Sequence, residues 1–386
     1  MLAAFGLFVA ADGPVIDSMD SPTYAIPAGK GSVESVPGHV GSALKLAFPD
    51  NSSGTFATSR AHGTPEWDRA EGFSFWVKGD GSRHLGGIEL IWNGDYSERY
   101  ACSFPIDSTE WRKVTVAWRD LVPELGKMER TVDATSGDAP SKLSAPAFGK
   151  WWYWRDYAAH SYAIDDIRIE PRVPAAPAPM PAAGPLDPVR AKLRSGKPIT
   201  IVTMGDSLTD TAHWSNRKTN WPAMLKEKLK AQYGSDVTIV NPAMGGTELR
   251  QNLVVMPRWV QEAPSPDLVT VFFGGNDWNA GMRGPNFLAA QKDAIDRIRR
   301  ATGGRADVLI LSTCPSAANG TMYAELADAC RVAAADRKAG FADVYSAVQA
   351  LDADHRQAVF ASDGVHLSPA GQTLVADAVT AQLAPR

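Results

Sequence analysis

The chain has 386 residues, of which 44% are hydrophobic and 21% are charged. This length favours two folded domains, and this composition is typical of a globular protein. The formal net charge of −4 leaves no excess of basic residues, so no nucleic-acid partner is expected.

The N-terminus carries a short apolar run, LAAFGLFVAA, at residues 2–11. Its apolar core followed by small residues is typical of a secretory signal, although no basic segment precedes it. The other interpretation is the first strand of the domain. We expect an exported protein, secreted or periplasmic. No later stretch is long and apolar enough for a membrane helix, so no membrane partner is expected.

Residues 13–170 consist of short alternating runs separated by glycine, proline, aspartate and serine. Such spacing predicts an all-β domain, an antiparallel sandwich, with little helix. The runs lie at residues 42–48, 72–79, 87–92, 112–118 and 162–170.

Tryptophan and tyrosine gather in this half, most densely in the run Trp151, Trp152, Tyr153 and Trp154. Exposed aromatic rings can stack on the C–H face of a sugar, because the face of the aromatic ring is negative. Aromatic residues also fill the core of a sandwich. Both interpretations stay open for each of these residues.

Four aspartates lie near the two ends of this half, at Asp17, Asp20, Asp165 and Asp166. They could gather around a structural calcium ion, or they could be surface carboxylates paired with Arg168 or Lys113. No metal site and no cofactor are predicted from them.

The three cysteines, Cys102, Cys314 and Cys330, are too few and too scattered for a disulfide scaffold or a zinc site. Cys330 shares a helical stripe with Tyr323 and Leu326, which favours a buried free thiol. A disulfide between Cys314 and Cys330 is the alternative.

Residues 171–188 read PRVPAAPAPMPAAGPLDP. Repeated proline prevents both a helix and the interior of a sheet. We therefore expect an extended spacer here, followed by a second domain at residues 189–386.

Apolar strands and amphipathic helices alternate in the second half. Helices are predicted at residues 221–233 and 286–301, and a last one starts with Ser368 as its cap and Pro369 in its first turn. This alternation predicts a parallel sheet covered by helices on both faces, a three-layer α/β domain. The strands are expected at residues 199–204, 237–241, 268–273, 307–312 and, more weakly, 341–345.

Polar motifs follow these strands: GDSL at residues 205–208, NPAMGGT at 241–247, GGND at 274–277, and DGVH at 363–366 before the last helix. Ligands of parallel sheets lie beyond the carboxyl ends of the strands, so all four motifs are expected at one edge. Ser207 alone could equally cap a helix. The other motifs favour a nucleophile.

The order G-D-S-L, N-x(4)-G, G-x-N-D and D-x-x-H resembles the SGNH hydrolases, also called GDSL esterases. This resemblance covers about half of the chain, from residue 199 to the C-terminus. It implies a flavodoxin-like α/β fold and ester hydrolysis by a serine nucleophile. The first half, with FSFWVKGDGS, STEWRKVTVAWRDLVP and AIDDIRIE, more loosely resembles jelly-roll, galactose-binding-like modules found beside carbohydrate-active enzymes.

A serine hydroxyl needs a base to become a nucleophile. The second half holds three histidines, and only His366 has a carboxylate, Asp363, three residues earlier in the same loop. Asp363 can accept the second imidazole N–H and fix the tautomer of the ring. His213 and His355 are expected to be polar surface residues.

Attack on an ester places negative charge on the carbonyl oxygen, which donors must stabilise. The family resemblance assigns this role to the backbone N–H of Ser207, the backbone N–H of Gly246 and the side-chain amide of Asn276. Asp206 and Asp277 are expected to tie down loops.

Trp278 and Trp221 are candidate substrate contacts, with core packing as the alternative for Trp278. Together these features predict a secreted esterase that removes short acyl groups, acetyl above all, from an acylated carbohydrate or polysaccharide. Two alternatives stay open: a lipase, arylesterase or thioesterase acting on small or fatty acyl esters, and a non-catalytic carbohydrate-binding protein.

Overall fold

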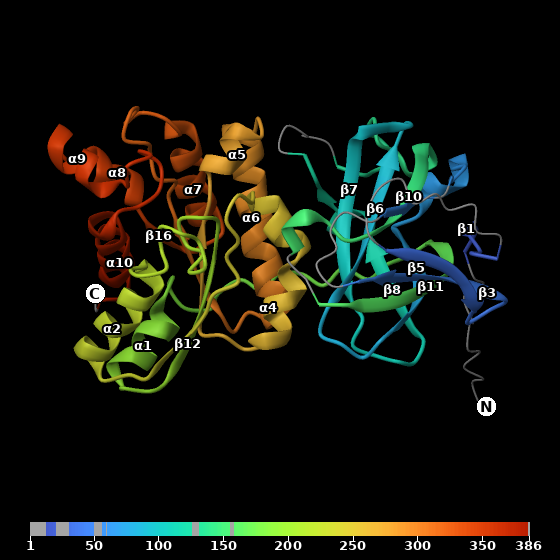
Figure 1. The fold of residues 1–386 in the computed structure, drawn as a ribbon, viewed down its shortest axis with the longest axis horizontal. Coiled ribbons are helices and arrows are strands. Elements are labelled where there is room, and N and C mark those ends of the chain that lie inside the picture. Colours follow the sequence, from blue (N-terminus) through green and yellow to red (C-terminus); the bar gives the residue numbers. More distant parts are fainter. Residues whose placement is uncertain are drawn as a thin grey trace, which may run out of the picture. The chain divides into compact units, whose positions relative to one another are not determined.

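A computed structural model describes residues 13–20, 31–49, 56–58, 60–125, 131–154 and 158–384. The chain forms two compact units (Figure 1). The first comprises Met1–Leu121 and Arg130–Ala175, and the second comprises Val122–Glu129 and Ala176–Arg386. The apolar run at residues 2–11, interpreted above as an export signal, lies outside the described residues. Within the described part of the chain, no helix has the length and apolar character to cross a bilayer.

Two antiparallel sheets make up the first unit. One has the strand order β2-β3-β11-β5-β8, with β1 added on β11, and the other includes the order β4-β10-β6-β7. The strands of the first sheet are β1 (Val15–Asp17), β2 (Ser32–Pro37), β3 (Ser42–Phe48), β5 (Gly72–Gly79), β8 (Arg112–Ala117) and β11 (His160–Glu170). Those of the second are β4 (Phe56–Thr58), β6 (Leu85–Trp92), β7 (Asp95–Pro105) and β10 (Leu143–Gly149).

Side chains from the two sheets meet in a shared core. The rings of Phe75 on β5 and Phe104 on β7 lie edge to face with their centroids 5.0 Å apart. The Tyr162 hydroxyl on β11 donates to the carbonyl oxygen of Gly149 on β10 at 3.2 Å. The strands predicted at residues 42–48 and 72–79 are confirmed by β3 and β5. A jelly-roll connectivity stays a prediction.

The aromatic run at residues 151–154 is mostly core. Trp151, Tyr153 and Trp154 are at most 4% exposed, whereas Trp152 is 53% exposed. Core packing therefore explains three of the four side chains. Sequence alone left this open, because a buried and an exposed aromatic residue look the same in the chain.

The aspartates considered for calcium have partners within the protein. Asp20 accepts the backbone N–H of Ser42 at 2.8 Å, and Asp165 accepts that of Val40 at 2.8 Å. Asp166 forms an ion pair with Arg168 at 2.7 Å. Among the residues placed by the structure, no group of three or more histidine, cysteine or acidic side chains could hold a metal ion.

A parallel sheet with the strand order β13-β12-β14-β15-β16 forms the centre of the second unit (Figure 1). Its strands are β12 (Ile199–Gly205), β13 (Val237–Val240), β14 (Leu268–Phe272), β15 (Asp307–Leu311) and β16 (Gly340–Ala342). The strand expected at residues 341–345 is shorter than predicted. The Asp343 side chain accepts the N–H of Ser346 and thereby starts helix α8 (Val344–Gln349).

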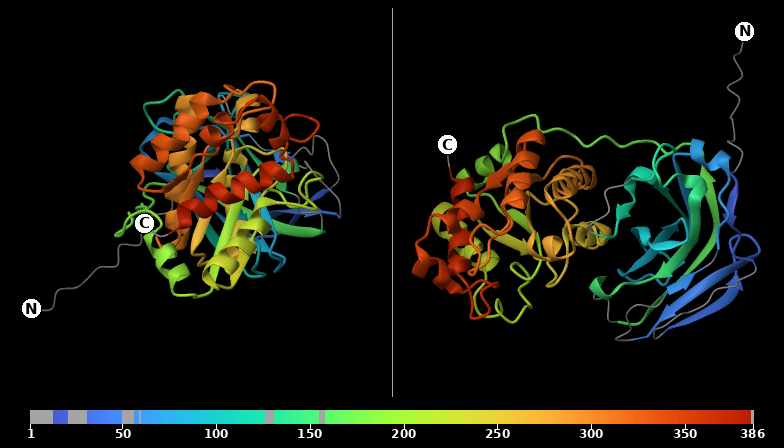
Figure 2. Two further views of the ribbon diagram at one scale, coloured as in Figure 1. Left: turned by 90° about the vertical axis from the view of Figure 1, so that its left-hand side faces the viewer. Right: turned by 90° about the horizontal axis from the view of Figure 1, so that it is seen from above.

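Helices cover both faces of this sheet, as predicted (Figures 1 and 2). One layer contains α1, α2 and α10 with the short α8 and α9, and the other contains α6 and α7. The remaining helices, α3, α4 and α5, lie in the connections on either side of β14. Their bounds are α1 (Asp187–Arg194), α2 (Trp221–Tyr233), α3 (Leu249–Val254), α4 (Met256–Glu262), α5 (Gly275–Asn279), α6 (Gly284–Thr302), α7 (Ala324–Asp336), α9 (Ala353–Val359) and α10 (Pro369–Leu383).

The starts of these helices follow local signals. The Ser368 hydroxyl accepts the backbone N–H of Ala370 and Gly371, which confirms it as the cap of α10. Helix α2 has the predicted bounds. Helix α1 begins at Asp187, inside the stretch predicted as spacer, because Pro188 is well tolerated in the first turn of a helix.

None of the three cysteines forms a disulfide bond. The alternative of a bridge between Cys314 and Cys330 is therefore wrong, and the buried free thiol predicted at Cys330 is confirmed. Burial raises the pKa of both thiols to about 12, so both stay protonated at neutral pH.

Candidate active site

Ser207 lies in a tight turn at the carboxyl end of β12. A Cβ atom on Gly205 would come within 2.3 Å of Thr209 Oγ1, so only glycine fits where the strand ends. Side chains from elsewhere in the chain also hold this turn in place. The fully buried Asn216 donates through Nδ2 to the Ser207 carbonyl oxygen at 2.6 Å, and its own Oδ1 accepts from Gln372 Nε2 at 2.8 Å.

Ser207, His366 and Asp363 form a continuous chain of hydrogen bonds. Ser207 Oγ lies 3.0 Å from His366 Nε2, and His366 Nδ1 lies 2.6 Å from Asp363 Oδ2. With Nδ1 protonated, His366 donates to Asp363 and its Nε2 is free to accept the serine proton. The structure thus brings Ser207 together with the loop that carries Asp363 and His366, which lies far from it in the sequence.

The Asp363 carboxylate is held in its ionised form. Burial by itself would raise its pKa, but hydrogen bonds from the His366 side chain and from the N–H groups of Val365 and His366 outweigh this and lower the pKa to about 2. The negative charge therefore persists at neutral pH. It can stabilise the imidazolium that forms when His366 takes a proton.

Of the three donors predicted for the oxyanion, Ser207 and Asn276 line the same cavity, and Gly246 follows Gly245, on which a Cβ atom would lie 3.5 Å from Ser207 Cβ. The Asn276 amide nitrogen donates to the Thr247 carbonyl oxygen at 3.1 Å and to Asp206 Oδ2 at 3.5 Å, and these two contacts orient the group. Gly246 is exposed and has a φ of 79°, a left-handed conformation that glycine adopts without strain. Within the described ranges, the backbone N–H groups of Ser207 and Gly246 have no acceptor in the protein.

Buried carboxyl groups lie behind these donors. Asp206 Oδ1 accepts the Leu208 N–H at 2.9 Å, and Asp277 Oδ1 accepts the Leu249 N–H at 3.0 Å, so both tie down loops as predicted. Burial raises the pKa of Asp206 to about 7 and that of Asp277 to about 6, although these hydrogen bonds act in the opposite direction. For Asp206, the charge of Asp277 raises the pKa further. Burial and the charge of Asp277 also raise the pKa of Glu248 to about 8.

A cavity of about 110 Å³ opens beside Ser207 at the ends of β14 and β15. Asn276 and His366 line it, together with the buried residues Phe272 and Phe273. Tyr323, which the sequence predicts on a helical stripe with Cys330, lines the same cavity.

The structure changes the assignment of the tryptophans. Trp221 is fully buried in the core between α2 and the sheet, so its prediction as a substrate contact is wrong. Trp278 is half-buried and packs edge-on against Tyr323, with ring centroids 5.7 Å apart, rather than lining the cavity. Trp214 is instead the exposed tryptophan at the site: it is 56% exposed and its ring lies 5.5 Å from that of His366.

His213 also differs from its prediction. Its ring stacks on that of His366 with centroids 4.4 Å apart and an interplanar angle of 28°, so it is part of the site rather than a surface residue. His355 is exposed and bonds to the Asp352 carboxylate at 2.7 Å, as expected of a polar surface residue. Spacing in the sequence carries no sign of the stack, because His213 and His366 meet only in the folded chain.

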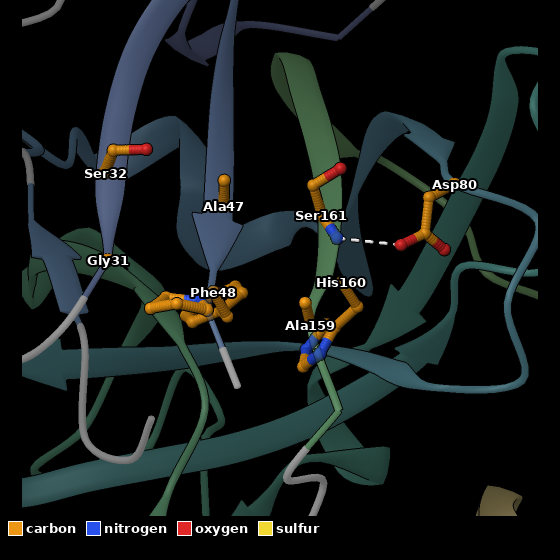
Figure 3. A pocket seen from close by; sticks show the side chains of 9 residues that line it. Gly31, Ser32, Ala47, Phe48, Asp80, Ala159, His160 and Ser161 are labelled. Carbon is orange, nitrogen blue, oxygen red and sulfur yellow. Dashed lines mark hydrogen bonds between the residues drawn. The ribbon is translucent and has the colours of Figure 1, made fainter. Parts of the chain in front are cut away.

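A larger hollow, of about 610 Å³, lies on the six-stranded sheet of the first unit (Figure 3). Phe48 and His160 stack there with ring centroids 5.0 Å apart, and the Asp80 carboxylate accepts the Ser161 N–H at 2.8 Å. The residues lining it include no serine with a histidine and a carboxylate in series. The volume of a cavity therefore does not identify the active site. The arrangement of side chains around Ser207 makes the smaller cavity the better candidate.

Comparison with known proteins gives a family for the second unit. Residues 203–374 match the model of the GDSL-like Lipase/Acylhydrolase family. No curated protein sequence matches the chain.

Solved structures resemble the same half of the chain. An acetylxylan esterase from Geobacillus stearothermophilus is 18% identical with a TM-score of 0.41, over 50% of this chain and 97% of that one. An α/β-hydrolase enzyme from the metagenome of Lake Arreo, Spain, is 19% identical with a TM-score of 0.40, over 48% and 94%. A lipase/acylhydrolase from Enterococcus faecalis is 20% identical with a TM-score of 0.39, over 48% and 95%. The C-terminal half of this chain is therefore similar to the GDSL-like Lipase/Acylhydrolase family over residues 203–374.

Proposed function

We propose that the protein is a serine esterase that removes short acyl groups, acetyl above all, from hydroxyl groups of a carbohydrate. The observation that carries this proposal is the hydrogen-bonded series from Ser207 Oγ through His366 to Asp363, at 3.0 and 2.6 Å. A hydroxyl, an imidazole and an ionised carboxylate in this order are what nucleophilic acyl transfer requires.

In the reaction, Ser207 Oγ attacks the ester carbonyl carbon while His366 Nε2 takes the hydroxyl proton. The carbonyl oxygen becomes an oxyanion, which accepts hydrogen bonds from the Ser207 N–H, the Gly246 N–H and the Asn276 amide. When the tetrahedral intermediate collapses, the C–O bond to the alcohol breaks and His366 returns the proton to the leaving oxygen. Water then attacks the acyl-serine by the same route and releases the carboxylic acid.

The size of the cavity supports a short acyl group. Its volume of about 110 Å³ is well below the roughly 300–1,000 Å³ of pockets that hold drug-sized ligands. Its lining includes Phe272 and Phe273, each at most 2% exposed. A fatty acyl chain would need an extended apolar groove, and this cavity does not supply one.

Trp214 supports a carbohydrate as the alcohol part of the ester. Its exposed indole lies beside His366, the group that protonates the leaving oxygen, and it does not line the acyl cavity. A sugar attached through the leaving oxygen would come to lie on this side. An aromatic face is a suitable surface for the C–H groups of a sugar ring.

The remaining parts of the proposal concern the first unit. The two antiparallel sheets are proposed to form a carbohydrate-binding module of about residues 13–170, joined by the spacer at 171–188 to a catalytic domain at 189–386. The module would hold the acylated polysaccharide partner, and the protein would be secreted or periplasmic, where such polymers occur. The aromatic and polar lining of the hollow in Figure 3 supports a polar ligand of this kind.

The first test is hydrolysis of p-nitrophenyl acetate by purified full-length protein. Ser207→Ala and His366→Ala should each lower kcat by about a thousandfold or more, because nucleophile and base act as a unit. Circular dichroism checks that both variants are folded. Folded Ser207→Ala with near wild-type turnover would refute the nucleophile assignment, and an inactive wild type would favour the non-catalytic alternative.

The second test measures acetate release from a panel of acetylated glycans, including xylan and alginate. Trp214→Ala should lower kcat/KM on the preferred glycan by roughly 3- to 10-fold through KM and leave p-nitrophenyl acetate turnover nearly unchanged, because only the sugar uses the indole. Trp214→Phe, which keeps an aromatic ring, is the matched control. No acetate release from any glycan, with rates that climb with acyl chain length, would favour the lipase alternative.

A further inference from the structure

Tyr323 has an unusual backbone conformation for a bulky residue. It precedes the first residue of α7 with φ 71° and ψ 11°, in the left-handed region that residues other than glycine, asparagine and aspartate rarely adopt. Its carbonyl oxygen accepts the backbone N–H of Leu326 and Ala327, so the start of the helix holds the residue in this conformation. Strained residues of this kind cluster at functional sites.

The conformation points the phenol ring into the cavity beside Ser207. Tyr323 is 7% exposed, and it lines the cavity together with Ser207 and Asn276. Its hydroxyl lies 4.0 Å from where a Cβ on Gly275 would be, next to the oxyanion donor Asn276. Burial, reinforced by the nearby Asp206 carboxyl group, raises the pKa of this hydroxyl, so the phenol stays neutral.

The ring is supported from behind. Trp278 packs edge-on against it, and the Arg283 guanidinium lies 3.9 Å above the ring of Trp278. Arg283 Nη1 is held in turn by the carbonyl oxygens of Trp278 and Met282, at 3.0 and 2.8 Å. Tyr323 thus lies between the cavity and a braced tryptophan that does not itself reach the cavity.

We propose that Tyr323 is the residue that sets the upper limit of acyl chain length. This inference rests on the proposed esterase function. The ring closes the side of the cavity toward Trp278, and a longer acyl chain would have to displace a side chain that helix α7 and Trp278 hold in place. A smaller side chain at position 323 would extend the cavity toward Trp278.

The test compares kcat/KM on p-nitrophenyl acetate, butyrate and octanoate for full-length wild type and variants. Tyr323→Asn keeps a residue that tolerates the left-handed backbone and removes the ring. It should raise the octanoate-to-acetate ratio about tenfold or more, mainly through a lower KM for octanoate, because each added methylene gains buried surface. Tyr323→Phe keeps the ring and should retain the wild-type ratio.

Tyr345→Asn is the matched control, since Tyr345 is a half-buried tyrosine of the same unit that lies outside the cavity. It should leave the ratio unchanged. Tyr323→Gly is a second enlarging variant that also suits the backbone, and thermal melting identifies any variant that is unfolded. Folded Tyr323→Asn or Tyr323→Gly with the wild-type ratio overturns the inference. A wild type that hydrolyses none of the three esters refutes the proposed function instead.

Discussion

The amide of Asn276 is a donor whose contribution can be isolated by mutation. Asn276→Ala should lower kcat by roughly 10²- to 10³-fold with a smaller effect on KM, because the hydrogen bond strengthens only as charge develops on the carbonyl oxygen. The measurement is steady-state kinetics on p-nitrophenyl acetate. An unchanged kcat in the folded variant would remove Asn276 from the oxyanion site.

Asp206 links the site to the pH dependence of stability. Its pKa of about 7 in the folded chain lies above the value of about 3.9 expected when unfolded. The folded state therefore binds this proton more tightly, and the stabilisation is complete below about pH 4 and is lost as pH rises through about 7. Asp277, with a pKa of about 6, acts in the same direction.

Asp206→Asn should therefore reduce the fall in the free energy of unfolding between pH 5 and pH 8, measured by urea denaturation. The asparagine can still accept the Leu208 N–H, so the loop keeps its hydrogen bond. Asp363 does not interfere, because its pKa of about 2 keeps it ionised throughout this range. Equal pH dependence in variant and wild type would show that Asp206 is ionised in the folded protein.

The loop between β12 and α2 contributes two aromatic side chains to the site. The stack of His213 on His366 holds the imidazole against rotation, and an aromatic pair of this kind contributes about 0.5–1.5 kcal/mol. His213→Ala should therefore lower kcat on p-nitrophenyl acetate by about 2- to 12-fold with little change in KM. His355→Ala, on the exposed face of α9, is the control, and an equal loss in both variants would argue against a specific effect of the stack.

At the scale of the whole molecule, the second unit takes in the distant segment Val122–Glu129. Arg250 Nη1 on α3 donates to the Leu125 carbonyl oxygen at 2.9 Å. A fragment of residues 176–386 lacks this acceptor. A hydrogen bond from a charged group contributes about 1.5–3 kcal/mol.

We expect the fragment to fold and to hydrolyse p-nitrophenyl acetate, because every residue of the proposed catalytic series lies within it. It should melt about 3–12 °C below the corresponding unit of the full chain. Arg250→Ala should cost less stability in the fragment than in the full chain, since the bond is already missing there. An insoluble or inactive fragment would show that the rest of the chain is required for this unit.

Local features of the sequence were enough to predict the strands and helices of the second unit and the residues Ser207, Asp363 and His366. Strands such as β12 and helices such as α2 follow from the period of apolar residues and from caps, and these signals lie within a few residues of one another. The partners Ser207, Asp363 and His366 were also predictable, because parallel strands place the ends of distant segments at one edge of a sheet.

Only the tertiary structure decided what surrounds these residues. Trp221 became core, Trp278 a support for Tyr323, and Trp214 an exposed neighbour of His366, although all three look alike in the sequence. The pKa of Asp206 likewise depends on Asp277, and the cavity beside Ser207 is lined by residues 313–316 and by Tyr323, all distant in the sequence. The physical reason is that burial and ring contacts are set by neighbours from distant parts of the chain, and no local pattern records them.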